Sequence, residues 1–210
     1  PFADERTALT YGKQRGSSTT HFSEHQIFHQ WYPDVSVNRQ SIPFCNNANA
    51  AIRRELWTQH PYDETLPGLE DLEWGKWAQE QGFGISYCAE AEVIHVHNES
   101  LAGIYNRYKR EGMAFKRIYP HETFTLLDLI HLFSQNVLND WREARRKRLL
   151  QANWQKIIGF RWLQFYGTYQ GYRQSGPLTW QLKKAFYYPR ETQAAKPAEK
   201  RRNIEPIQYN

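Results

Sequence analysis

Two short segments do most to constrain the fold of this 210-residue chain. Residues 69–74 (LEDLEW) place three acidic side chains at the start of a helix predicted over 69–81. Residues 93–97 (VIHVH) cover the end of a strand predicted over 92–96, where His95 and His97 share one face because side chains alternate along a strand. A helix that begins with carboxylates and a strand that ends in imidazoles indicate an α/β chain with a candidate base and candidate metal ligands.

The rest of the pattern alternates short strands with helices and then becomes helical. Strands are predicted at 7–11, 42–45, 85–87 and 92–96. Helices are predicted at 24–31, 50–57, 69–81, 102–119 and 125–172. Asparagines at 46, 47 and 49 mark a strand-to-helix junction, because their side chains compete for backbone groups. After Pro189 the chain is polar and basic, which predicts a disordered tail.

Charge is divided unevenly along the chain. Residues 1–140 carry 12 basic and 18 acidic side chains, whereas residues 141–202 carry 15 basic and 3 acidic ones. The formal net charge of +5 therefore hides an acidic first part and a strongly basic second part. Such a split is typical of two parts with different functions.

Cysteine content indicates the compartment. Cys45 and Cys88 have neither the number nor the spacing of a disulfide framework or a Cys-rich zinc site. A reducing compartment, the cytoplasm, is therefore expected. The sequence shows no signal peptide and no run of about 18 apolar residues that could cross a bilayer.

Each of the two opening motifs has two interpretations. Acidic side chains in a first helical turn often just complement the helix dipole. A carboxylate such as Asp71 would also stay ionised there, because the positive helix end favours its charge, and could accept a proton from an attacking hydroxyl. His95 and His97 are either half-buried strand histidines or ligands for a divalent cation.

The order of the motifs is more specific than either motif. An Asn-bearing strand runs into an Arg-containing helix (46–54), an acidic turn follows (61–64), and then come the Glu-Asp helix (68–74), a glycine and a strand that ends in histidine (91–95). This order resembles the family 2 glycosyltransferases over roughly residues 5–120. The resemblance implies the C-terminal part of a GT-A (Rossmann-like) domain, with an appended helical region.

Site residues follow from that resemblance. It implies that Asp71 is the catalytic base and that Glu70 supports it or helps to hold the acceptor. It implies that His95, with His97 as a rival, binds a divalent metal, Mg²⁺ or Mn²⁺, which is expected only together with the donor half. The substrate-binding residues that it implies are Asn46, Asn47, Asn49, Arg53 and Trp74, although Trp74 has an equal interpretation as a core residue. The implied reaction is inverting transfer from a nucleotide-sugar donor to a saccharide or lipid-linked saccharide acceptor, as in bacterial surface polysaccharide synthesis.

The resemblance also implies a division of the chain. Residues 1–120 would be the acceptor-side half, 121–188 a basic and aromatic helical extension that could associate with a membrane, and 189–210 the tail. No Asp-x-Asp occurs in the sequence, so the donor half is expected upstream and the isolated chain is expected to be inactive. The segments 105–116 and 165–173 suit an anionic membrane surface at the inner face of the cell membrane, or else a basic face packed on the catalytic domain.

Two other classes of function remain open. The basic, aromatic second part is also typical of nucleic-acid binding, although no recognisable nucleic-acid module accompanies it. A metal-dependent hydrolase would use Asp71, His95 and His97 together with further ligands. His21, His25 and His29 recur at helical spacing and could form a metal face, or else a polar helix stripe.

Overall fold

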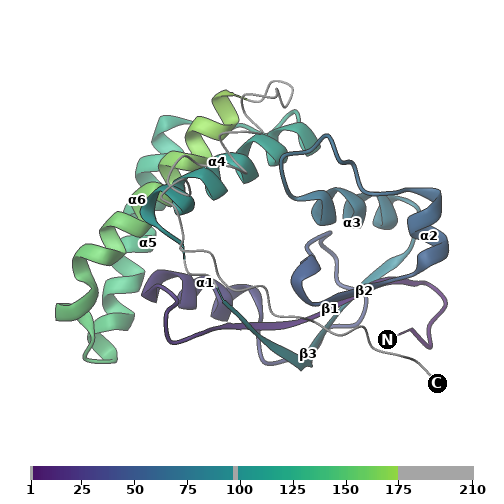
Figure 1. Cartoon of the computed structure of the whole chain (residues 1–210), viewed down its shortest axis with the longest axis horizontal. Helices are drawn as coiled ribbons and strands as arrows, with labels where there is room; N and C mark the ends of the chain where they lie inside the picture. Colours follow the sequence, from purple (N-terminus) through teal and green to yellow (C-terminus); the bar gives the residue numbers. More distant parts are fainter. Residues whose placement is uncertain (1, 97–98, 175–210) are drawn as a thin grey trace, which may run out of the picture. The chain divides into compact units, whose positions relative to one another are not determined.

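The computed structural model describes residues 2–96 and 99–174. These residues form a small sheet and a set of helices (Figure 1). The strands are β1 (Thr7–Gly16), β2 (Ala50–Ile52) and β3 (Gly84–His95). The helices are α1 (Phe22–Trp31), the 3-10 turn η1 (Asn47–Asn49), α2 (Arg54–Gln59), α3 (Glu70–Glu80), α4 (Leu101–Ile118), α5 (Leu126–Arg146) and α6 (Leu150–Arg173). The predicted tail 189–210, and residues 175–188 of the predicted extension, lie outside the described part of the chain.

The sheet has the order β2-β1-β3, with β1 in the centre. β1 runs antiparallel to β2 and parallel to β3. The register between β1 and β3 shifts after Gly12, where an added Cβ would meet the Ala91 carbonyl oxygen at 2.2 Å. Only glycine permits this close approach of the two strands. A mixed sheet covered by helices confirms the α/β class.

Pairing with β1 changes two of the predicted elements. The segment 50–57, predicted as one helix, is β2 followed by α2. The segments 85–87 and 92–96, predicted as two strands, belong to the single strand β3. In both places the ladder to β1 decides the backbone conformation, because tertiary pairing overrides the local preference of alanine for helix.

Residues 42–45, predicted as a strand, have no regular secondary structure. Two side-chain amides, instead of a neighbouring strand, donate hydrogen bonds to this segment. Gln79 Nε2 and Gln40 Nε2 donate to the Ile42 carbonyl oxygen at 3.0 and 2.8 Å. Pro43 lacks a backbone donor, so this segment could not have completed a central ladder.

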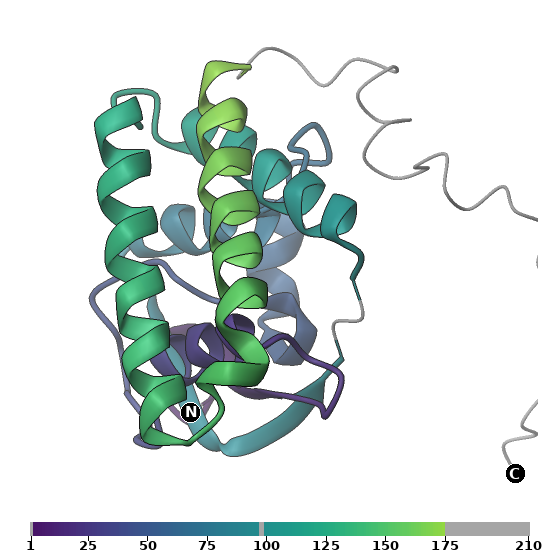
Figure 2. The ribbon, with the colours of Figure 1, turned by 90° about the vertical axis from the view of Figure 1, so that its left-hand side faces the viewer.

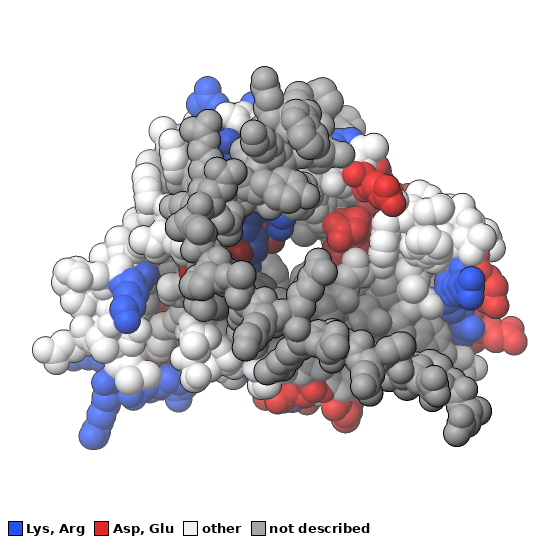
Figure 3. Space-filling model, in the orientation of Figure 1, with Lys and Arg blue, Asp and Glu red and all other residues white. Residues whose placement is uncertain are grey.

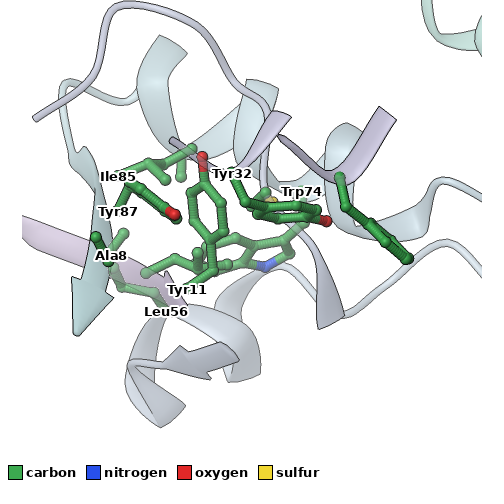
Figure 4. Packing of buried hydrophobic residues seen from close by; sticks show 12 residues of the cluster. Ala8, Tyr11, Tyr32, Leu56, Trp74, Ile85 and Tyr87 are labelled. Atoms are coloured by element: carbon green, nitrogen blue, oxygen red, sulfur yellow. The ribbon is translucent and has the colours of Figure 1, made fainter. Parts of the chain in front are cut away.

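The main core lies between the sheet, α1 and α3. The rings of Tyr11, Tyr32 and Tyr87 contact one another in a triangle (Figure 4): the Tyr11 centroid lies 5.2 Å from that of Tyr87 and 6.4 Å from that of Tyr32, and the Tyr32 and Tyr87 centroids are 6.4 Å apart. Trp74 of α3 is 0% exposed and belongs to the same cluster. Trp74 and Ala78 give α3 the buried face that packs on the sheet, and Gly82, at a φ of 85°, follows the end of the helix.

Three long helices form the other part of the described chain (Figure 2). The predicted helical run 125–172 is two helices, because the chain turns at 147–149 and Arg148 takes a φ of 59°. α6 packs on α4 at glycines: a Cβ on Gly112 or Gly171 would lie 2.7 and 2.2 Å from backbone oxygens of the other helix. Much of 105–116 and 165–173 therefore forms this helix interface.

Buried ion pairs fix these helices to each other and to α1. The Arg161 guanidinium donates to both oxygens of Asp140 at 2.8 and 2.9 Å, and both side chains are buried. Arg107 of α4 contacts Glu24 of α1 at 2.6 Å and Glu99 at 2.8 Å. No described helix combines the length and the apolar character needed to cross a bilayer.

Candidate functional site

A pocket of about 590 Å³ lies between the part of the described chain that holds the sheet and the part that holds the long helices. Its walls come from the irregular segment 42–46, the start of α3, and the inner faces of α4 and α6. Two carboxylates, Asp71 and Glu111, line it. The rest of the lining mixes aromatic, aliphatic and uncharged polar residues, and its aromatic residues include Trp31, Phe44, Phe115, Tyr119, Phe124 and Tyr172. Ligand sites commonly have this composition, with a few polar groups among apolar and aromatic walls.

Asp71 is held in one orientation by two backbone donors. The Asn47 N–H donates to Oδ2 at 3.1 Å, and the Leu72 N–H donates to Oδ1 at 2.8 Å. Leu69, just before α3, takes a left-handed φ of 58°, and the helix begins there. The side chain is half-buried in the pocket wall.

Burial changes the acidity of Asp71. Desolvation raises the pKa of Asp71 to about 6, against the lowering effect of the Asn47 and Leu72 N–H groups. The negative charge of Glu70 raises the pKa further. The sequence predicts that the helix end keeps this carboxylate ionised; desolvation outweighs the donors, so the carboxylate is less acidic than an ordinary aspartate. A carboxylate with a raised pKa is a better base near neutral pH.

Glu111 is the second carboxylate of the pocket, and sequence reasoning missed it. It lies on α4, and burial raises its pKa, while the charges of Arg107 and Arg110 lower it. The charge of Asp71 also raises the pKa of Glu111, so the two carboxylates act on each other. Its spacing of four residues from Arg107 suggested only a helix-surface pair, because the pocket depends on α3 and α4 lying close in space.

The predicted asparagines divide between the pocket and the sheet. Asn46 lines the pocket, and its Oδ1 accepts from the Ala48 N–H at 2.9 Å, which caps η1. Asn47 positions Asp71 through its backbone, and its own Oδ1 accepts from the Tyr62 hydroxyl at 2.8 Å. Asn49 donates to the Ala91 carbonyl oxygen at 2.7 Å and so holds β3. Two of the three asparagines therefore lie beside the candidate base.

Two other predicted residues have structural contacts instead. Arg53 precedes α2 and donates to the carbonyl oxygens of Thr7 and Phe2 at 2.7 and 3.0 Å. Trp74 is in the core, where its Nε1 donates to the His60 carbonyl oxygen at 2.7 Å. Neither lines the pocket. For Trp74, the structure favours the core interpretation over stacking on a sugar.

Comparisons with known proteins add no assignment. No protein-family model, curated protein sequence or solved structure matches the chain. The function is therefore inferred from the pocket, its two carboxylates and its aromatic wall.

The histidines do not assemble a metal centre in the described residues. His95 lies at the end of β3, opposite Gly16 and 6.1 Å from the Phe28 ring, and is not part of the pocket wall. His97 lies outside the described residues. Within residues 2–96 and 99–174, no group of three or more His, Cys, Asp or Glu side chains could hold a metal ion. His21, His25 and His29 therefore do not form the metal face that their spacing allowed. A single imidazole does not fit the donor set that Mg²⁺ or Mn²⁺ needs.

Proposed function

We propose that this chain carries the acceptor side of an inverting glycosyltransferase and that Asp71 is its catalytic base. One observation carries the proposal: Asp71 projects from a helix start into an aromatic pocket, held by two N–H donors and with its pKa raised to about 6. At neutral pH such a group is mostly ionised and still basic enough to take a proton from a sugar hydroxyl.

The proposed reaction needs one protein carboxylate. Asp71 takes the proton of the acceptor hydroxyl as its oxygen attacks the anomeric carbon of the donor. The bond from that carbon to the nucleoside diphosphate breaks, and its electron pair leaves with the diphosphate. Attack from the side opposite the leaving group inverts the anomeric configuration. None of these steps requires a metal ion bound by His95.

The pocket wall suits a saccharide. Sugar rings have apolar faces that pack on aromatic rings, and Phe115, Tyr119 and Tyr172 offer such rings from α4, its end and α6. Glu111, in the same pocket, would accept a hydrogen bond from a second acceptor hydroxyl and so orient the first one toward Asp71. Aromatic packing would then supply affinity, and the two carboxylates would supply orientation.

The proposal assigns only the acceptor to this pocket. The 210 residues contain no Asp-x-Asp, so binding of the nucleotide sugar is assigned to protein outside this sequence. Glu70, the first residue of α3, would act through its charge on Asp71.

Saccharide binding by the chain itself is the first test. Phenyl glycosides of glucose, galactose, rhamnose and N-acetylglucosamine are titrated while tryptophan fluorescence is followed, since Trp31 lines the pocket. We expect saturable binding of at least one glycoside and weaker binding by Glu111→Gln. Glu55→Gln, an exposed carboxylate on α2, is the matched control and should bind as the unmodified chain does. Absence of binding by every glycoside would refute the acceptor site.

Turnover tests the base separately. In protein that includes a donor-binding part, Asp71→Asn should lower the transfer rate by about 10²- to 10⁴-fold, because general base catalysis contributes about that much. Glycoside binding should stay within a few fold of the unmodified protein. Undiminished turnover by the variant would refute the assignment of Asp71, even if saccharide binding is confirmed.

A further inference from the structure

The end of the α5–α6 hairpin carries a concentrated positive charge. Its exposed basic residues are Arg142, Arg145, Arg146, Lys147 and Arg148. Glu143 is the one acid among them, and it pairs with Arg146 and Lys147 at 2.6 and 3.1 Å. On the face shown in Figure 3, blue side chains project from this end of the helices at the lower left. The group therefore keeps a strong net positive charge.

Aromatic and aliphatic side chains lie among these cations. Trp154 and Leu149 are 44% and 45% exposed at the same turn. A shallow hollow of about 510 Å³ is lined by Trp141, Arg145, Arg148, Leu150, Gln151 and Trp154. The Trp141 Nε1–H donates to the Trp154 carbonyl oxygen at 3.4 Å, which links α5 to α6 beneath the hollow. Indole rings and guanidinium groups thus share one surface.

The outer face of α5 continues this surface as a stripe of exposed aliphatic residues with polar residues among them. Leu127, Ile130 and Leu138 are 77%, 51% and 47% exposed, and their helical spacing places them on one side. Leu129, Val137 and Ala144 are buried on the other side. A second shallow hollow runs along this face to the basic turn, lined by Leu127, Ile130 and Leu138 together with the polar residues His131, Ser134, Gln135, Asn139 and Arg142.

Acidic groups on α5 do not interrupt this surface between Leu127 and the turn. Asp128 closes the capping box with Thr125 at the start of the helix. Asp140 is buried against Arg161. Glu143 is occupied by its two cationic neighbours. Between Leu127 and the turn, the exposed face therefore carries aliphatic side chains among polar, non-acidic ones, and it is cationic at its end.

We propose that the outer face of α5 and the α5–α6 turn dock on the surface of an anionic lipid bilayer. Arginine side chains would contact headgroup phosphates, Trp154 would lie at the headgroup level, and Leu127, Ile130 and Leu138 would enter the acyl boundary. A nucleic acid would use the cations and the indoles but would gain nothing from the aliphatic stripe, so the stripe decides for a bilayer. This surface lies within the predicted extension 121–188, on α5 and the turn that follows it, and outside the segment 105–116.

Vesicle sedimentation of the whole chain tests this surface. Vesicles of phosphatidylcholine alone are compared with vesicles that also contain phosphatidylglycerol. We expect binding to the anionic vesicles that falls with added salt, and little binding to the neutral ones. Arg145→Glu with Arg148→Glu should weaken binding at least about 25-fold, because each surface cation contributes about fivefold. Arg6→Glu with Arg54→Glu, the same charge change at exposed residues outside α5 and α6, should have a much smaller effect.

A serine variant separates the bilayer from other polyanions. Replacement of Leu127, Ile130 and Leu138 by serine keeps every charge and should still abolish most of the vesicle binding. Leu127→Ser alone, at the most exposed of the three, should give a smaller loss and serves if the triple variant does not fold. The proposal would be overturned if the serine variants bound vesicles as strongly as the unmodified chain does. It would also be overturned if the two charge-reversal variants lost equal amounts of vesicle binding. Binding of a single-stranded oligonucleotide that matches vesicle binding in all the variants would overturn it as well.

Discussion

Replacement of Asp71 by asparagine tests whether the folded chain holds this carboxylate at an energetic cost. The pKa of Asp71 rises from 3.8 to about 6 on folding, because burial outweighs the two N–H donors. The folded chain therefore binds the proton more tightly than the unfolded chain. One pKa unit corresponds to about 1.4 kcal/mol, so ionised Asp71 lowers the free energy of unfolding by about 3 kcal/mol above pH about 6. Below pH about 4 this cost is absent.

Asparagine resembles the protonated carboxyl but retains a single side-chain acceptor. One of the bonds from Asn47 and Leu72 is therefore lost, at a cost of about 1 kcal/mol. The two effects together predict that Asp71→Asn raises the free energy of unfolding by about 2 kcal/mol near pH 8 and lowers it by about 1 kcal/mol near pH 4. When a catalytic carboxylate that is held at an energetic cost is replaced, stability is expected to rise while the rate of transfer falls.

Urea unfolding followed by tryptophan fluorescence measures both values. Asp34→Asn is the control of opposite sign, because hydrogen bonding and charge from Lys13 hold the pKa of Asp34 below its ordinary value. Its stabilising contribution is present at neutral pH and is lost as the pH falls through the ordinary range of an aspartate. If Asp71→Asn destabilises the chain equally at both pH values, Asp71 has no raised pKa and the reasoning about the base fails.

Packing between the long helices gives further predictions. Gly171→Ala places a Cβ 2.2 Å from the Lys109 carbonyl oxygen, so α4 and α6 must separate, and we expect a loss of about 2 kcal/mol in urea unfolding. Gly159→Ala, in the same helix with nothing within 4 Å, should gain about 1 kcal/mol, and a loss of similar size in both variants would contradict this packing. Asp140→Asn leaves the buried Arg161 guanidinium without its carboxylate and should lower stability by about 3–5 kcal/mol. Asp140→Leu with Arg161→Met should recover most of that loss, and an equal or larger loss in the double variant would exclude an unpaired charge as the cause.

Local signals in the sequence were enough to predict those helix boundaries that are set by residues at the helix end itself. The acidic start and Gly82 delimit α3, and Thr125 with Asp128 closes a capping box at the start of α5. By contrast, β2 was predicted as helix, because its extended conformation comes from pairing with β1 rather than from its own alanines. The turn at 147–149 was missed because nothing in its basic run breaks a helical pattern.

In the candidate site, too, some features follow from the local sequence and others only from the tertiary structure. The sequence by itself determined the α/β class, the acidic helix start and the place of Asp71 within it, because those features depend on neighbouring residues. Only the tertiary structure decided that Asp71 is desolvated, that Glu111 shares its pocket and that Trp74 is in the core. Desolvation, the field of a second charge and a pocket wall all depend on atoms far apart in the sequence, and no local pattern encodes the distance between them.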